Sequence, residues 1–252
     1  MSTASQTPLR LALIGATGFV GRQVLDEALG RGHAVTAIVR HPDRLPEHEL
    51  LTPREADVQD LRQVAEAVRG HDAVLSCFHP GGHDGGADPT LYRDVVEGTR
   101  SIIEGVKAAG LSRIVYVGGC GSLYVRPGVM LVDDLAVLGA NMKQGRPEGT
   151  YPAPAAGKPS FDIPLAARMG FYLFEREDRL EWTFISPSRF LGEFGDATGD
   201  IRYGDDRLLL EPDGSPARLE VADLAVAMVD EVEEPRHIRC HYTVASSFPA
   251  SA

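Results

Sequence analysis

The sequence predicts an α/β protein built on a doubly wound parallel sheet, with a small C-terminal elaboration. Short apolar segments alternate along the chain with longer segments whose apolar residues recur at helical spacing. A glycine-rich turn separates the first apolar segment from the first helical one. With 252 residues and 43% hydrophobic content, the chain is long enough to bury one large core. We therefore expect residues 1–8 to form a flexible tail and residues 9–252 to form a single domain.

The first element predicted is a buried strand over residues 11–14, because helices cover both faces of such a strand and leave no polar alternation. Three glycines follow at a spacing of Gly-x-x-Gly-x-x-Gly. Gly15 allows a sharp turn, Gly18 allows the backbone to approach a ligand closely, and Gly21 allows the next helix to pack against the sheet. That helix ends near residue 30, and a second strand covers residues 35–39.

This arrangement of strand, glycine turn, helix and strand predicts a dinucleotide site on a Rossmann sheet. The N–H groups and the positive dipole end at the start of the helix suit a pyrophosphate, and the Thr17 hydroxyl adds a donor. The alternative is a structural turn that binds nothing. The residues expected to contact the cofactor here are Gly15, Thr17, Gly18, Phe19, Val20 and Gly21.

The end of the second strand predicts which nicotinamide cofactor binds. A carboxylate at this position accepts hydrogen bonds from a ribose diol, but the sequence has Arg40 there. A guanidinium pairs with a 2′-phosphate, and Arg44 lies one helical turn further on as a second contact. The sequence thus favours NADP(H), and the alternative is that Arg40 is a solvated surface residue.

The remaining elements alternate as a doubly wound sheet requires, so that ligands meet the carboxyl ends of the strands in the loops 15–21, 78–90 and 118–130. Strands are expected at residues 54–58, 72–78, 113–119, 182–187 and 240–245, helices at 61–68, 91–109, 163–178 and 222–233, and a hairpin at 201–220.

Further cofactor contacts are expected where these strands end. Asp57 and Val58 are placed to meet the adenine, although Asp57 is equally well explained as an acid at a helix start. Phe78 and His79 open a glycine-rich loop that can lie against the cofactor, and Gly118 ends the fifth strand. The spacing of His79 and a second histidine, four residues on, suits a metal only on a helix, which the intervening proline and glycines disfavour, so we expect no metal.

Three residues are candidates for the chemistry. Ser122 follows the fifth strand, where a hydroxyl could polarise a carbonyl or orient the nicotinamide amide, and Tyr124 is close enough to be a proton donor. Arg189 follows the strand at 182–187, at the same edge of the sheet. The alternative for each is a packing or surface role. Residues 145–160 are either a lid over the substrate or a surface loop.

Bulk composition excludes several classes of function. A formal net charge of −11 disfavours nucleic-acid binding. Three scattered cysteines suggest neither a disulfide framework nor a metal knuckle, and favour a reducing cytoplasm. The N-terminal residues do not resemble a signal peptide, and no stretch is long and apolar enough to span a bilayer. We expect a cytoplasmic protein with a small-molecule substrate and no nucleic-acid or membrane partner.

Several segments together resemble the atypical short-chain dehydrogenase/reductases of the NAD(P)H-binding, NmrA-like type, and among them the group around biliverdin IXβ reductase (flavin reductase). They are "IGATGFVG", "HAVTAIVRHPDRL", "DAVLSCFHPGG", "IVYVGGCGSL...PGVMLVD", "LEWTFISPS" and the "ARLEVADLAVAMVDEVEEPRHIRCHYTVA" tail. The resemblance implies a monomer or homodimer that binds NADP(H) and reduces flavins, quinones or other conjugated acceptors, or a cofactor sensor without turnover. It supports the roles of Gly15, Thr17, Gly18, Gly21, Arg40 and Ser122.

The chain departs from the larger superfamily in one respect. A Tyr-x-x-x-Lys pair is missing, since Tyr124 and Tyr151 have no lysine at that spacing and Tyr172 is followed by Arg176. A ketone reductase without this acid is handicapped, whereas hydride transfer to a conjugated acceptor with a proton from water is not. The sequence therefore favours such a reductase. A redox-sensing binding protein is the alternative, and a sugar epimerase is less favoured.

Overall fold

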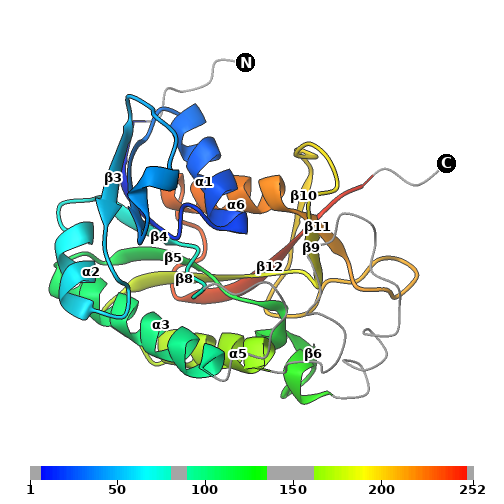
Figure 1. Ribbon diagram of the computed structural model, residues 1–252. Coiled ribbons are helices and arrows are strands. Elements are labelled where there is room, and N and C mark those ends of the chain that lie inside the picture. The colour runs from blue at the N-terminus through cyan, green and yellow to red at the C-terminus, as the bar shows by residue number, and fades with distance from the viewer. Residues whose placement is uncertain (1–6, 81–89, 135–161, 249–252) are drawn as a thin grey trace.

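A computed structural model describes residues 7–80, 90–134 and 162–248 (Figure 1). Its main feature is an eight-stranded sheet with the strand order β10-β12-β8-β5-β4-β1-β2-β3, in which every pair is parallel except β10 with β12. The doubly wound α/β fold is therefore confirmed. In chain order the strands of this sheet are β1 (Arg10–Ile14), β2 (Ala34–Val39), β3 (Leu51–Glu55), β4 (Ala73–Ser76), β5 (Arg113–Val117), β8 (Glu181–Pro187), β10 (Ile201–Tyr203) and β12 (Cys240–Ser246).

Helices cover both faces of the sheet, and each face has its own apolar core (Figure 1). The helices are α1 (Phe19–Gly30), α2 (Leu61–Val68), α3 (Leu91–Ala108), α5 (Asp162–Glu175) and α6 (Val221–Glu233). Helices α1 and α6 pack on one face, and α2, α3 and α5 pack on the other. In β1, Leu11 and Leu13 face the first core and Ala12 and Ile14 the second, because successive side chains of a strand point to opposite faces.

The sheet topology sets the position of the ligand crevice. From β1 the chain moves outward to β2 and β3, and it then returns to β4 on the other side of β1. In doubly wound sheets such a reversal leaves a crevice beyond the carboxyl ends of the two central strands. The glycine turn after β1 and the segment that begins at Cys77 after β4 lie at this crevice.

The third strand differs from its prediction. It spans Leu51–Glu55 rather than residues 54–58, and it contains Pro53. Proline cannot donate a ladder hydrogen bond and is tolerated in an edge strand, and β3 is the edge of this sheet. Asp57 and Val58 consequently follow the strand instead of ending it.

The hairpin predicted at 201–220 is confirmed only in its middle, where Leu210 and Pro216 form an isolated antiparallel bridge, and the strands at its two ends do not pair with each other. Strand β10 pairs with β12, whereas β11 (Arg218–Glu220) forms a separate parallel sheet with β9 (Phe190–Gly192). Each strand thus finds a partner that is distant in sequence. A second small sheet, β6 (Tyr124–Arg126) with β7 (Val129–Met130), follows β5. These short strands form the elaboration at the carboxyl side of the sheet.

Two buried carboxylates at the start of α6 hold this elaboration in place. Glu220 accepts the backbone N–H groups of Phe194 and Gly195 at 2.6 and 3.0 Å. Asp223 accepts the backbone N–H and the hydroxyl of Thr198 at 2.9 and 2.7 Å. Acidic side chains are favourable at a helix N-terminus, so the same carboxylates stabilise α6 and anchor the loop that follows β9.

Candidate functional site

The glycine turn after β1 has a geometry that only glycine allows. Gly15 has a φ of +82°, and a Cβ there would lie 2.7 Å from the carbonyl oxygen of Cys77. A Cβ on Gly21 would lie 2.0 Å from the Gly15 carbonyl oxygen, so the first turn of α1 rests directly on the turn. The backbone of β1, the start of α1 and the end of β4 are therefore packed together without intervening side chains.

The N-terminus of α1 is open to a ligand. Gly18 is the N-cap residue, no side chain of the described residues caps the helix, and its first turn contains no acid. The N–H groups of Val20 and Gly21 have no partner within the helix, because the first N–H groups of any α-helix lack one. Thr17 and Gly18 are exposed. An uncapped helix start beside a side-chain-free turn fits the pyrophosphate of a dinucleotide.

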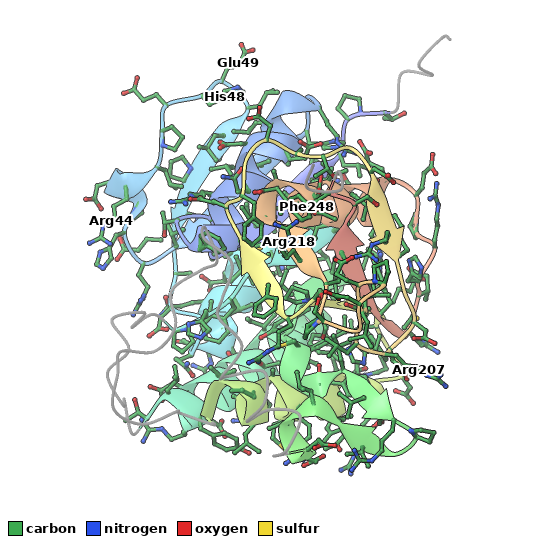
Figure 2. The ribbon with its side chains drawn as sticks, turned by 90° about the vertical axis from the view of Figure 1, so that its right-hand side faces the viewer. Arg44, His48, Glu49, Arg207, Arg218 and Phe248 are labelled. Atoms are coloured by element: carbon green, nitrogen blue, oxygen red, sulfur yellow. The ribbon has the colours of Figure 1, made fainter. Side chains whose placement is uncertain are left out.

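Arg40 reaches across this turn. It follows β2, is exposed, and its Nη2 donates to the carbonyl oxygen of Pro80 at 3.3 Å. Since β2 and β4 flank β1, the guanidinium bridges the two sides of the crevice. Arg44 ends a short 3₁₀ helix at Pro42–Arg44 and projects from the outer edge of the molecule (Figure 2).

The residues predicted to meet the adenine lie beside the start of α2. Asp57 is exposed, and its Oδ1 accepts the backbone N–H of Gln59 at 2.9 Å. Val58 is half-buried and packs on the second core. One carboxylate oxygen of Asp57 is therefore used in a local turn, and the contact of this residue with adenine stays a prediction.

The segments after β4 and β5 approach the crevice mainly through their backbones. The backbone nitrogen of Phe78 would lie 3.5 Å from a Cβ on Gly15, whereas its ring fills the space above Gly98 of α3, at 2.4 Å from a Cβ built there. His79 is half-buried. Gly118 has the Phe184 ring where a Cβ would be, at 2.0 Å, so no other residue fits that position without displacing the ring.

Ser122 lies in a buried polar cluster that sequence analysis does not identify. Its hydroxyl is 2.9 Å from the carbonyl oxygen of Gly119 and 2.9 Å from Oγ of Ser186, which in turn is 2.9 Å from Nε2 of His241. Ser122 is fully buried. A signal for Ser186 is present in the sequence, because it follows Trp182 and Phe184 at the two-residue period of one strand face.

Tyr124 lies on the side of the small β6–β7 sheet, where acidic groups surround it. Burial raises the pKa of its phenol, and the charges of Glu175 and Asp206 add to this effect. A phenol that acts as an acid near neutral pH needs the opposite shift. The charges that act on the Tyr124 phenol are therefore those of the carboxylates Glu175 and Asp206.

Arg189 follows β8 at the carboxyl edge, as predicted, and is half-buried. Its guanidinium carbon lies 5.9 Å from the centre of the Phe190 ring. Among the described residues its Nε is buried without a hydrogen-bond partner. The candidate lid at 145–160 and the second histidine of the glycine-rich loop, His83, lie outside the described residues.

Within the described part of the chain, no helix is long and apolar enough to cross a membrane.

Comparison with known proteins places the whole chain in one family. The family model described as NAD(P)H-binding matches residues 15–146. YwnB of Bacillus subtilis strain 168 is 32% identical over 240 residues, which cover 94% of this chain and 99% of YwnB.

Solved structures are also similar to this chain over nearly its whole length. A provisionally named epimerase from Bacteroides thetaiotaomicron is 33% identical, has a TM-score of 0.78, and covers 97% of this chain and 100% of its own. A provisionally named NADH-flavin reductase from Streptococcus pneumoniae is 25% identical, with a TM-score of 0.72 and coverage of 95% and 100%. The chain therefore belongs to the NAD(P)H-binding family of atypical short-chain dehydrogenase/reductases.

Proposed function

We propose that this protein is an NADP(H)-dependent reductase of conjugated small molecules such as flavins, quinones or enones. One observation carries the proposal. The glycine cradle, formed by Gly15, Gly18 and Gly21 at the start of α1, lies next to the guanidinium of Arg40 at the end of β2. The cradle suits any dinucleotide pyrophosphate. The guanidinium adds a preference for the nucleotide that carries a further phosphate on its adenosine ribose.

Each residue at the site is assigned one contact with the bound dinucleotide. The N–H groups of Val20 and Gly21 donate to the pyrophosphate, and the Thr17 hydroxyl adds a third donor. Arg40 leaves the Pro80 carbonyl and pairs with the 2′-phosphate, since one hydrogen bond of 3.3 Å to a neutral acceptor is weaker than a charge-assisted pair. When bound, the nicotinamide ring supplies a hydride.

We infer the class of acceptor from the absence of a tyrosine suited to protonate a carbonyl. Tyr124 lies among carboxylates and its pKa is raised, and the sequence has no Tyr-x-x-x-Lys pair. A carbonyl that must be protonated by a tyrosine is thus a poor substrate, whereas a conjugated acceptor takes a hydride at carbon or nitrogen without that acid. The relative named as an NADH-flavin reductase supports this choice.

Cofactor preference is tested by titrating NADPH and NADH into the wild type, Arg40→Glu and Arg207→Glu. Arg207 is an exposed arginine on the opposite side of the molecule from Arg44, so its replacement makes the same change in net charge away from the crevice (Figure 2). We expect tighter binding of NADPH than NADH, and a loss of about tenfold or more in NADPH affinity for Arg40→Glu alone, because a charge-assisted hydrogen bond contributes roughly 1.5–3 kcal/mol. Equal NADPH affinity in the wild type and Arg40→Glu contradicts the assignment.

Turnover is tested by following NADPH oxidation with a panel of flavins, quinones and enones. We expect reduction of at least one class of acceptor. Tight nucleotide binding without oxidation by any acceptor would instead support a redox-sensing binding protein, which the missing tyrosine–lysine pair also permits.

A further inference from the structure

Three buried polar side chains form a continuous chain of hydrogen bonds between the segment after β5 and strand β12. Ser122 contacts the Gly119 carbonyl oxygen and Ser186, and Ser186 contacts Nε2 of His241, each at 2.9 Å. A longer contact of 3.4 Å also joins Ser122 Oγ directly to Nε2 of His241. Ser122 and Ser186 are fully buried, and His241 is 7% exposed. This chain of hydrogen bonds runs from the segment after β5 across β8 to β12, on the face of the sheet that α3 and α5 cover.

The hydrogen bonds in this chain have one direction. The Gly119 carbonyl can only accept, so the hydroxyl proton of Ser122 is used there and Ser122 accepts from Ser186. Ser186 has then used its own proton and must accept from His241, which therefore carries its proton on Nε2. This arrangement satisfies the three contacts of 2.9 Å and leaves Nδ1 of the imidazole as an acceptor.

The surroundings keep His241 neutral. Its ring lies 4.3 Å from the centre of Phe171 and 5.4 Å, edge to face, from that of Phe184. Burial among these rings lowers the pKa of His241 to about 4. Near neutral pH the ring therefore acts as an uncharged group with one donor and one acceptor nitrogen.

The His241 end of this chain of hydrogen bonds lies beside a cavity. Nδ1 of His241 is buried and has no hydrogen-bond partner among the described residues. The same residue lines a cavity of about 460 Å³, whose wall also includes Glu175 and Asp206. A polar cavity of this size is large enough for several water molecules. A water molecule that reaches Nδ1 would satisfy the one atom of the hydrogen-bonded chain that has no partner in the described part of the protein.

We propose that His241, Ser186 and Ser122 form a proton relay that carries protons from this cavity to the acceptor. The proposal rests on the proposed reductase function and deepens it, since it assigns the proton path that the absent Tyr-x-x-x-Lys pair leaves open. We assign Ser122 to the acceptor end of the relay because it follows β5 at the carboxyl edge of the sheet. His241 and Ser186 act through it and do not touch the substrate.

The proton balance of the relay is complete. Reduction of the acceptor needs one proton besides the hydride. The hydroxyl of Ser122 turns from Gly119 and gives its proton to the acceptor; it then takes one from Ser186, which takes one from Nε2 of His241. Nδ1 takes a proton from water, which leaves hydroxide in the solvent. Before the next turnover, water that enters the empty crevice returns a proton through Ser122 and Ser186 to Nε2, while Nδ1 gives its proton to the hydroxide, which restores the first tautomer.

Two replacements interrupt the relay in different ways, and two serve as controls. Ser186→Ala removes the central hydroxyl, and His241→Gln retains an N–H donor toward Ser186 but cannot pass a proton. Ser186→Thr keeps the hydroxyl. Ser188→Ala removes a buried hydrogen bond of 2.8 Å, to the Ala217 carbonyl, that is outside the chain.

We expect Ser186→Ala and His241→Gln to lower kcat at least about tenfold and to raise the solvent deuterium isotope effect, while the Kd for NADPH stays unchanged. Ser186→Thr and Ser188→Ala should stay within about threefold of the wild type. Unchanged kcat in Ser186→Ala and His241→Gln overturns the relay. An equal loss of kcat and of NADPH affinity overturns it too, because that outcome identifies a structural role.

A measurement without nucleotide tests the direction of the chain. The ¹⁵N chemical shifts of His241 in the free protein should identify the Nε2–H tautomer, and its signals should move in Ser186→Ala. A proton found on Nδ1 overturns the relay. Wild-type protein that binds no nucleotide refutes the proposed function itself, and protein that binds NADPH but reduces no acceptor refutes the reductase and the relay while retaining the cofactor.

Discussion

At the scale of single residues, two glycines of helix α1 differ in the space around them, and replacing each one tests a different property, nucleotide binding or helix stability. A Cβ on Gly21 would lie 2.0 Å from the Gly15 carbonyl oxygen, whereas one on Gly30 meets nothing within 4 Å. We expect Gly21→Ala to displace the turn, lower the free energy of unfolding by about 1–3 kcal/mol and weaken NADPH binding.

Gly30→Ala should leave nucleotide affinity unchanged and raise stability by roughly 0.4–1 kcal/mol, because alanine restricts the unfolded chain. Urea unfolding and nucleotide titration of both variants measure these effects. Nucleotide affinity equal to that of the wild type in Gly21→Ala would show that the close contact between α1 and the turn is not needed for the site.

The residues of the glycine turn and Ser122 were predictable from the sequence, whereas Ser186 and His241 of the buried relay were not. The spacing of Gly15, Gly18 and Gly21 is local, and its consequences follow from backbone geometry alone. Ser186 and His241 meet only because β8 and β12 are parallel neighbours, with His241 in register with Phe184. That register depends on the packing of the whole sheet, which no local pattern encodes.

At the scale of elements, a buried ion pair joins α6 to the centre of the sheet. Arg113 of β5 donates to the Glu231 carboxylate at 2.9 Å, and the same carboxylate accepts from Thr183 of β8 at 3.3 Å. Burial lowers the pKa of Arg113, and Glu231 opposes this shift. Loss of one partner leaves a buried charge without compensation, which costs roughly 3–5 kcal/mol.

We therefore expect Glu231→Ala to lower the free energy of unfolding by about 3–5 kcal/mol. The matched control is Glu97→Ala, which removes an exposed pair with Arg100 on α3 and should cost less than about 1 kcal/mol. Denaturant unfolding of both variants compares them. A cost for Glu231→Ala no larger than that for Glu97→Ala would mean that the ion pair does not anchor α6.

The elements that sequence analysis placed wrongly are those with distant partners. The order of strands and helices follows from alternating periodicity, and it is confirmed. Strand β3 starts earlier than expected because its edge position accepts Pro53, and β10 and β11 pair with β12 and β9 instead of with each other. Short strands have little periodicity of their own, so their partners are set by tertiary packing.

At the scale of the whole molecule, the neutral state of His241 links folding to pH. The pKa of this residue falls from 6.5 to about 4 on burial, so at intermediate pH the unfolded chain binds a proton that the folded protein does not. This proton uptake favours the unfolded chain, so its cost to stability is nearly absent above about pH 6.5 and grows as the pH falls toward 4. A shift of this size corresponds to about 2 kcal/mol between pH 7 and pH 5.

We expect the free energy of unfolding of the wild type to fall by about 2 kcal/mol more than that of His241→Gln between pH 7 and pH 5. Glutamine has no proton to gain in this range, and the other titrating groups are common to both proteins, so their contributions cancel in the comparison. Urea unfolding at the two pH values measures the difference. Parallel losses in the two proteins would mean that His241 is as readily protonated in the folded state as in the unfolded chain, and the imidazole would then not be the uncharged group that the relay requires.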